Sequence, residues 1–145
     1  MLWVDALAKF NWLYNLVIAA GLTSLGVGYL TRPGAPVKAL GVSVITPDVT
    51  PGAPVSLVYR MDRDRTCPAT IAGFWVDVKG EAVARLSPVP GGYGVVGNNV
   101  RTPVTVYAPQ VPPGRYAYRS NMFSMCETGM FIMTSPDAWV TVTGY

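Results

Sequence analysis

The distribution of apolar and charged residues divides the chain into two parts near residue 32. No charged residue interrupts the apolar run from Phe10 to Thr31, which lies between Lys9 and Arg32. At about 1.5 Å of rise per residue, a helix of roughly 20 residues crosses the ~30 Å hydrocarbon layer of a membrane. The pattern therefore predicts one N-terminal transmembrane α-helix over residues 10–31, after a short flank over residues 1–9.

Two further features of this run concern its surroundings. Aromatic and basic residues near the ends of a span favour the boundary between lipid and water. The predicted interface residues are Trp12, Tyr14, Tyr29 and Arg32. Small residues at four-residue spacing share one helix face and let a second helix approach closely, although membrane helices are rich in small residues in general. The predicted helix–helix contacts, which would permit self-association, are Ala20, Ser24 and Gly28.

Two other interpretations of the run are open. A cleaved signal peptide has a shorter apolar core and a small-residue cleavage site, for which Gly26-Val27-Gly28 is a poor match. A wholly apolar helix is also stable when it is buried in a protein assembly. The charges beside the run, Lys9 and Arg32, do not decide the orientation in a membrane.

The chain after the run has the pattern of an all-β domain. All 13 prolines follow Arg32, and residues 32–37 form a Pro/Gly linker. Beyond it, short runs of β-branched and aromatic residues alternate with Pro/Gly turns, and alternate positions in Val55–Tyr59 and Val104–Tyr107 are apolar. This predicts an antiparallel sandwich of about seven strands over residues 38–145. The predicted strands are residues 38–46, 55–61, 71–78, 82–86, 102–107, 115–123 and 138–143.

One corner of this domain resembles a known fold family. The segment QVPPG, at residues 110–114, leads into Arg115-Tyr116-Ala117-Tyr118. This resembles the corner before the sixth strand of immunoglobulin-like and fibronectin-like sandwiches, in which a tyrosine hydroxyl bonds back to the turn backbone. Trp75 suits the core tryptophan of such folds. The resemblance implies an immunoglobulin-like antiparallel sandwich.

The two cysteines bear on the cellular compartment. Cys67 precedes the third predicted strand and Cys126 follows the sixth, so in a seven-strand sandwich both lie at one end. A disulfide is therefore expected there, the alternative being two free thiols in a reducing compartment. A disulfide favours a single-pass protein whose C-terminal domain lies on the non-cytoplasmic, periplasmic or extracellular, side of the membrane.

The composition excludes most classes of catalytic and ligand-binding site. The chain has no histidine, which excludes Ser-His-Asp and Cys-His arrangements and the usual zinc sites. The eight carboxylates lack the spacing of a calcium loop, and the glycine-rich stretch over residues 91–97 lacks the lysine of a phosphate-binding loop. The net charge of +3 is spread along the chain, unlike a nucleic-acid footprint. We expect no catalytic residue, metal, cofactor or nucleic-acid partner.

Two segments are candidates for protein contact. In YRMDRDR, the residues Arg60, Arg63 and Arg65 form either a solvated, self-neutralising loop or, if their guanidinium groups share one side, an edge that recognises a carboxylate or phosphate. Between Met122 and Met133 lie four of the six methionines. This segment either completes buried strands or forms an adaptable contact patch that includes Met130 and Phe131.

These features predict a non-enzymatic, membrane-anchored β-sandwich that acts as a binding or structural module. Its partners would be membrane lipid, other protein subunits, or both. The layout of a short N-terminus, an apolar helix, a proline hinge and YRMDRDRTCP leading to FWVDVKGE resembles small anchored proteins of tailed-phage genomes. That resemblance implies a virion or genome-ejection component, whose apolar helix packs in a protein assembly or inserts into the host membrane.

Overall fold

The computed structural model describes residues 17–18 and 34–144. The compact unit Ala35–Tyr145 contains all the strands of the described residues. Of the predicted helix over residues 10–31, only Val17 and Ile18 belong to the described part, and both are helical. No helix among the residues described here combines the length and apolarity that crossing a membrane requires.

One layer of the unit is a three-stranded antiparallel sheet. Its strand order is β1-β3-β7, and β3 pairs along its length with both neighbours. The strands are β1 (Val37–Val44), β3 (Pro54–Arg63) and β7 (Gly97–Tyr107). β3 is therefore the central strand of this sheet, with β1 on one side and β7 on the other.

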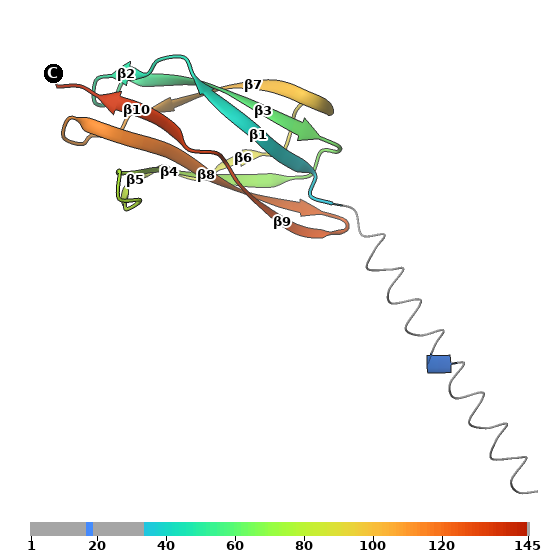
Figure 1. Ribbon diagram of the computed structural model, residues 1–145. Coiled ribbons are helices and arrows are strands. Elements are labelled where there is room, and N and C mark those ends of the chain that lie inside the picture. The colour runs from blue at the N-terminus through green and yellow to red at the C-terminus, as the bar shows by residue number, and fades with distance from the viewer. Residues whose placement is uncertain (1–16, 19–33, 145) are drawn as a thin grey trace, which may run out of the picture. The chain divides into compact units, whose positions relative to one another are not determined.

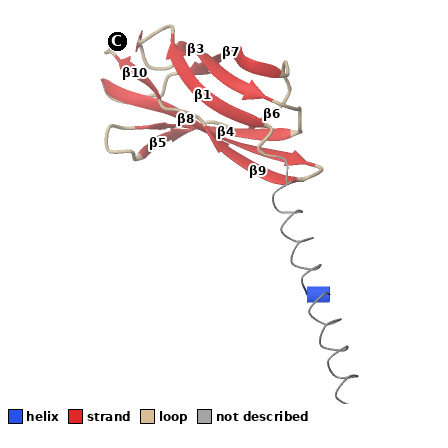
Figure 2. Cartoon of the chain, turned by 45° about the vertical axis from the view of Figure 1, so that its right-hand side comes forward, coloured by secondary structure: helices blue, strands red, loops and turns tan. Residues whose placement is uncertain are grey.

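The second layer is a larger sheet in which β8 and β4 form the centre. Its order is β2-β10-β8-β4-β5, with β9 also paired to β8 and β6 also paired to β4. All pairings are antiparallel except the short parallel contact of β2 with β10. The strands are β2 (Asp48–Val49), β4 (Ala69–Val76), β5 (Ala82–Arg85), β6 (Val89–Gly91), β8 (Gly114–Cys126), β9 (Gly129–Thr134) and β10 (Ala138–Val142). Figures 1 and 2 show this sheet facing β1, β3 and β7 as two layers of a β-sandwich.

The core forms where the inward faces of the two sheets meet. Val55, Leu57 and Tyr59 are buried at alternate positions of β3, as the apolar alternation predicts. Trp75 of β4 is fully buried, packs edge-on against Tyr118 at 5.4 Å between ring centroids, and donates a 3.0 Å hydrogen bond from Nε1 to the Tyr107 carbonyl. The prediction that Trp75 is a core tryptophan is confirmed.

The proline-rich corner before β8 also has the expected geometry. Tyr116 Oη donates a 2.9 Å hydrogen bond to the carbonyl oxygen of Pro112. The bond joins the start of β8 to the turn before it, since donor and acceptor are only four residues apart. The predicted bond from a tyrosine hydroxyl to the turn backbone is therefore confirmed.

All seven predicted strand segments form strands, and three further strands join them. β2 and β6 contain two and three residues, too few for a periodic pattern to be visible in the sequence. The third, β9, lies in the methionine-rich segment, where the sequence left a buried strand and an exposed patch both open.

Candidate binding surface at the disulfide end

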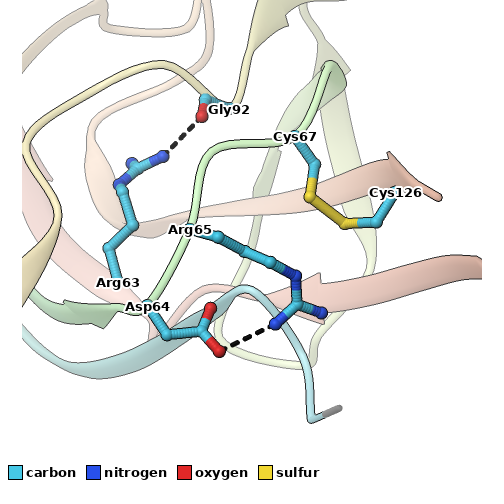
Figure 3. Close-up of a disulfide and its surroundings, with 6 residues drawn as sticks. All are labelled: Arg63, Asp64, Arg65, Cys67, Gly92 and Cys126. Carbon is cyan, nitrogen blue, oxygen red and sulfur yellow. Dashed lines mark hydrogen bonds and ion pairs between the residues drawn. A yellow bond between two sulfur atoms is a disulfide. The ribbon is translucent and has the colours of Figure 1, made fainter. Parts of the chain in front are cut away.

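A disulfide joins Cys67, which precedes β4, to Cys126, the last residue of β8 (Figure 3). The two Cα atoms lie 5.2 Å apart, and Cys67 is buried. Beside the bridge, the Met125 amide donates a 2.8 Å hydrogen bond to the Pro68 carbonyl. The predicted disulfide is present, and it lies beside the turn of the hairpin formed by β8 and β9.

The β8–β9 hairpin places four large apolar side chains on one outer face. Its register pairs Phe123 with Ile132 and Met125 with Met130. Because successive side chains of a strand point to opposite faces, these four lie together on the side away from the core. We call them the hairpin face: Phe123, Met125, Met130 and Ile132.

Three of the four side chains of the hairpin face are exposed, and Phe123 is half-buried. Met125 is 61% exposed, Met130 62% and Ile132 59%. The intervening positions point inward, since Met122 is buried and Met133 packs against the core. Alternate positions of the methionine-rich segment therefore complete the core, as one interpretation predicts, and the others form an exposed apolar patch, whose role in contact stays a prediction.

The predicted contact residue Phe131 lies on the inward side of β9, opposite Ser124. Its ring is half-buried beneath the Arg65 guanidinium, whose Cζ lies 5.6 Å from the ring centroid. Arg65 also forms a 2.7 Å ion pair with Asp64 (Figure 3). Phe131 therefore lies outside the hairpin face. The positive charge of Arg65, which packs on its ring, is balanced by Asp64.

The three arginines of YRMDRDR do not share one side, so the predicted arginine recognition edge is wrong. Arg60 is exposed on the outer face of β3, directly opposite Arg101 of β7. Arg63 lies on the other face of β3 and is only 6% exposed. Arg65 follows the strand, near the disulfide. Alternation along β3 separates Arg60 from Arg63, because three positions reverse the side-chain direction.

Arg63 instead belongs to the interior of the sandwich. Nη1 donates a 2.6 Å hydrogen bond to the Gly92 carbonyl (Figure 3). Nη2 lies 3.5 Å from the Met61 sulfur. The alternation that places Val55, Leu57 and Tyr59 in the core also predicts this placement of Arg63. When it is continued along β3, the next two inward positions are Met61 and Arg63.

Arg63 helps to line a cavity between the sheets that sequence reasoning missed. The cavity has a volume of about 150 Å³, and its polar lining includes Tyr59, Tyr118, Ser120 and Ser135. Burial raises the pKa of Tyr59 to about 12, a shift that the nearby Ser135 hydroxyl opposes in part. Burial also raises the pKa of Tyr118. Both hydroxyls therefore stay protonated and can donate hydrogen bonds at neutral pH.

The remaining predicted site residues lie outside the described part of the chain. These are the interface residues Trp12, Tyr14, Tyr29 and Arg32 and the helix-contact residues Ala20, Ser24 and Gly28. Over residues 17–18 and 34–144, no three histidine, cysteine or carboxylate side chains converge as a metal site would require.

Comparison with known proteins identifies no family for the chain. No protein-family model matches it, and no curated protein sequence is significantly similar. Solved structures align with it only at low identity and low TM-score. An alkylpurine DNA glycosylase, AlkC, from Pseudomonas fluorescens aligns with 15% identity and a TM-score of 0.41, over 75% of this chain and 31% of the glycosylase. The chain thus spans less than a third of that enzyme.

Two other structures align at a similar level. The CARDB domain of the PF1109 protein from Pyrococcus furiosus, solved with di-metal ions, has 8% identity and a TM-score of 0.40, over 78% of this chain and 97% of that domain. The sporulation control protein Spo0M from Bacillus subtilis has 10% identity and a TM-score of 0.37, over 77% and 50% of the respective chains. At these scores, none of the three bears on the function of this chain.

Proposed function

We propose that this protein is a non-enzymatic, membrane-anchored β-sandwich that binds a second protein through the hairpin face. The observation that carries the proposal is the pairing of Met125 with Met130 and of Phe123 with Ile132 on the outer side of the sheet. On a sheet with one solvated face, these positions are ordinarily polar. Four apolar side chains in two adjacent cross-strand pairs form a contiguous surface that another protein can cover.

The chemistry of this surface favours an apolar partner. Covering an exposed methionine or isoleucine side chain contributes about 1–2 kcal/mol when, as here, it is already partly covered. Methionine side chains adapt their shape to the partner because they are unbranched. The adjacent Arg65 is neutralised by Asp64, so binding is expected to depend little on salt concentration.

The anchoring part of the proposal rests on the uncharged run over residues 10–31. Its length suits a membrane-spanning helix, and the linker after it would join the helix to the sandwich. The Cys67–Cys126 bridge supports a location of the sandwich on the non-cytoplasmic side, where disulfides persist. Membrane lipid would then be the partner of the N-terminal segment, and protein the partner of the hairpin.

An immunoglobulin-like fold is the finer assignment that suits such a module. Two features support it: the core position of Trp75 and the hydrogen bond from Tyr116 to the preceding turn. A third is that the first two strands belong to different sheets, since β1 pairs with β3 and β2 pairs in parallel with β10. Sandwiches of this type present loops and hairpins at their two ends for binding.

The second candidate function is a structural component of a phage virion or of its genome-ejection apparatus. The resemblance of the chain layout to anchored phage proteins favours it, and the hairpin face would then pack in the particle. Carbonate extraction separates the two candidates, because an integral anchor stays in the membrane pellet. Co-purification with a particle in fixed copy number would instead favour the assembly role.

The hairpin contact can be tested by photo-crosslinking in intact cells. A benzophenone amino acid replaces Met130 in one variant and Val78 in a matched control, since Val78 is also an exposed apolar residue, at 68%, in the turn between β4 and β5. We expect discrete protein adducts from position 130 only, and their loss when Ile132→Glu is added. Equal adducts from both positions, or lipid adducts alone from position 130, would contradict the proposal.

A further inference from the structure

The interior cavity that contains Arg63 lies between β3 of one sheet and β4 and β8 of the other. Tyr59, Met61 and Arg63 occupy alternate positions of β3 and therefore all point into it. From the opposite sheet, Ser120 and Met122 of β8 line it at alternate positions in the same way. Gly92 and the exposed Tyr93 border the cavity beside β6.

The positive charge in this cavity has no ionic partner. Arg63 is 6% exposed, and its two hydrogen bonds go to a backbone carbonyl and a thioether sulfur, both of which are neutral. No carboxylate of the described residues forms an ion pair with it. A buried guanidinium normally pairs with an anion, since desolvation of an unpaired charge is costly. With five N–H donors on the group, several remain for a ligand.

A second polar group in the same cavity is not satisfied by the protein. Tyr59 is 6% exposed, and its hydroxyl lies near the Ser135 hydroxyl, but no atom of the described residues meets it at hydrogen-bonding geometry. Tyr59 and Arg63 are separated by one inward position of β3, so both side chains approach the cavity from the same strand. Buried hydroxyls are almost always hydrogen-bonded, and an exception is a reason to look for a ligand.

The rest of the cavity wall is mostly apolar. Met61, Met122 and Met133 contribute to it, and no acidic residue does. A protein cavity of about 150 Å³ can hold a benzene-sized molecule. The site therefore offers a cation and a hydroxyl donor beside a compact apolar space.

We propose that this cavity binds a small monocarboxylate with a compact apolar body. The Arg63 guanidinium pairs with the carboxylate through two parallel N–H donors, and the Tyr59 hydroxyl donates a hydrogen bond to it. The methionine side chains contact the apolar body. This ligand site is separate from the hairpin face and does not depend on the function proposed for it.

Methyl NMR on the full chain in detergent micelles tests the proposal, because the methionines are reporters placed inside and outside the cavity. Benzoate is the probe, and benzyl alcohol, which has the same ring and no charge, is the neutral control. We expect benzoate to shift the methyl signals of Met61 and Met122 in a saturable way and to leave those of Met125 and Met130 unchanged. Benzyl alcohol is expected to bind at least tenfold more weakly.

Two variants separate the roles of the polar groups. Arg63→Met keeps the length of the side chain and removes the charge, and we expect it to weaken benzoate at least tenfold. Tyr59→Phe is expected to weaken benzoate severalfold while leaving benzyl alcohol unchanged. If Arg63→Met does not fold, the comparison of benzoate with benzyl alcohol in the unmodified chain still decides the matter.

Four results would overturn the assignment. They are the absence of a saturable shift at the inner methionines, equal affinity for benzoate and benzyl alcohol, full benzoate affinity in a folded Arg63→Met variant, and displacement of benzoate by chloride at equal concentration. The last result would mean that the site selects an inorganic anion and makes no use of its apolar wall.

Discussion

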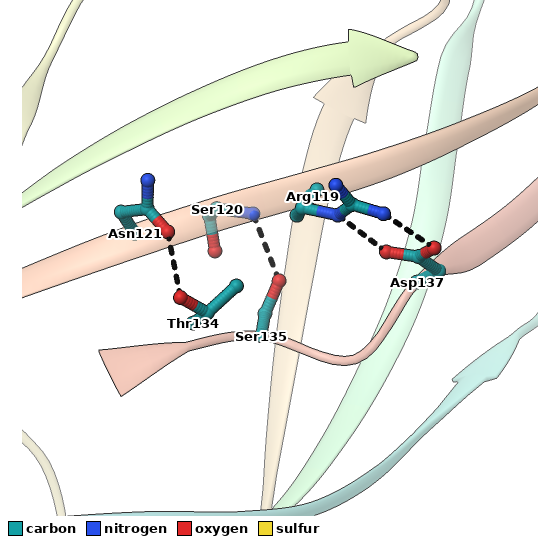
Figure 4. Close-up of polar contacts among 6 residues, drawn as sticks. All are labelled: Arg119, Ser120, Asn121, Thr134, Ser135 and Asp137. Atoms are coloured by element: carbon teal, nitrogen blue, oxygen red, sulfur yellow. Dashed lines mark hydrogen bonds and ion pairs between the residues drawn. The ribbon is translucent and has the colours of Figure 1, made fainter. Parts of the chain in front are cut away.

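Arg119 and Asp137 connect β8 to the segment between β9 and β10 through a bidentate ion pair (Figure 4). Nε donates to Oδ1 at 2.7 Å, and Nη2 donates to Oδ2 at 2.8 Å. Beside this pair, the Ser120 amide donates to Ser135 Oγ and the Ser135 amide donates back to the Ser120 carbonyl. These contacts hold the chain against β8 where it passes from one strand to the next.

The ion pair predicts a loss of stability in acid. The hydrogen bonds from Arg119 lower the pKa of Asp137 in the folded protein. The pair therefore contributes fully above the ordinary aspartate pKa of about 3.9, and its contribution disappears as pH falls through the lower folded-state value. Both side chains are about one-third exposed, so we expect a contribution of only about 0.5–1 kcal/mol.

Urea unfolding of the full chain in detergent measures this contribution. Asp137→Asn should reduce the free energy of unfolding by about 0.5–1 kcal/mol at about pH 7, and by much less at about pH 2.5. Arg119→Lys, which keeps the charge but loses the planar two-pronged contact, should recover only part of the stability. An effect of Asp137→Asn that is the same at both pH values would show that the ion pair is not its source.

Burial of Tyr59 predicts a second loss of stability, in alkali. Its pKa of about 12 exceeds the ordinary tyrosine value of 10.0, because burial disfavours the phenolate. A pKa raised by folding stabilises the protein fully below pH 10, and this contribution is lost as pH rises through about 12. Two pKa units correspond to about 3 kcal/mol as an upper estimate.

The alkaline effect can be measured by comparing the unmodified chain with Tyr59→Phe. We expect the variant to unfold at higher pH, with a smaller decrease in the free energy of unfolding between about pH 10 and 12. The tyrosinate absorbance should show one fewer late-titrating hydroxyl in the variant. Tyr118 serves as an internal reference, since burial raises its pKa as well. Identical titration curves for the two proteins would refute the assignment to Tyr59.

The disulfide gives a third prediction, on global stability. Cys67 and Cys126 are 59 positions apart, so the bridge closes a long loop of the unfolded chain. In the chain-entropy model, opening such a loop lowers the free energy of unfolding by about 4 kcal/mol. We expect this loss in Cys67→Ala/Cys126→Ala, measured by urea unfolding. Added reductant should destabilise the unmodified chain and leave the double variant unchanged; sensitivity of both would point to another cause.

Local patterns in the sequence predict the strands well, since periodic burial is a property of neighbouring residues. The alternation over Val55 to Tyr59 and the turn before Tyr116 both lead to the observed geometry. The disulfide was predictable for a related reason, because the strand order brings Cys67 and Cys126 to one end of the sandwich. The first two features are local to one strand or turn, and the disulfide follows from the order of the strands.

The sites depend on contacts between distant segments, and these were less predictable. The cavity combines Arg63 of β3 with Ser135, which follows β9, and no local pattern links the two. The segment YRMDRDR has the composition of a charged loop, but β3 continues through Arg63 and directs its side chain inward. The methionine-rich segment was ambiguous because a hairpin at a sheet edge buries alternate side chains and exposes the rest.

Gly92 and Gly80 form a matched pair that tests the close packing at the cavity mouth. Both have a φ of +84°, which a residue with a Cβ adopts at a cost of about 1–2 kcal/mol. A Cβ at Gly80 would meet no atom within 4 Å, whereas a Cβ at Gly92 would overlap the carbonyl oxygen of Cys67. The Gly92 carbonyl also accepts the hydrogen bond from Arg63.

We therefore expect unequal effects from the same substitution. Gly80→Ala should lower the free energy of unfolding by about 1 kcal/mol, from the backbone conformation alone. Gly92→Ala should cost at least about 2 kcal/mol more, because backbone atoms on both sides must move. Urea unfolding gives both values, and the Met61 methyl signal should shift only in Gly92→Ala. Equal costs would mean that the segment around Gly92 moves aside freely, and that it does not hold the Arg63 guanidinium in place.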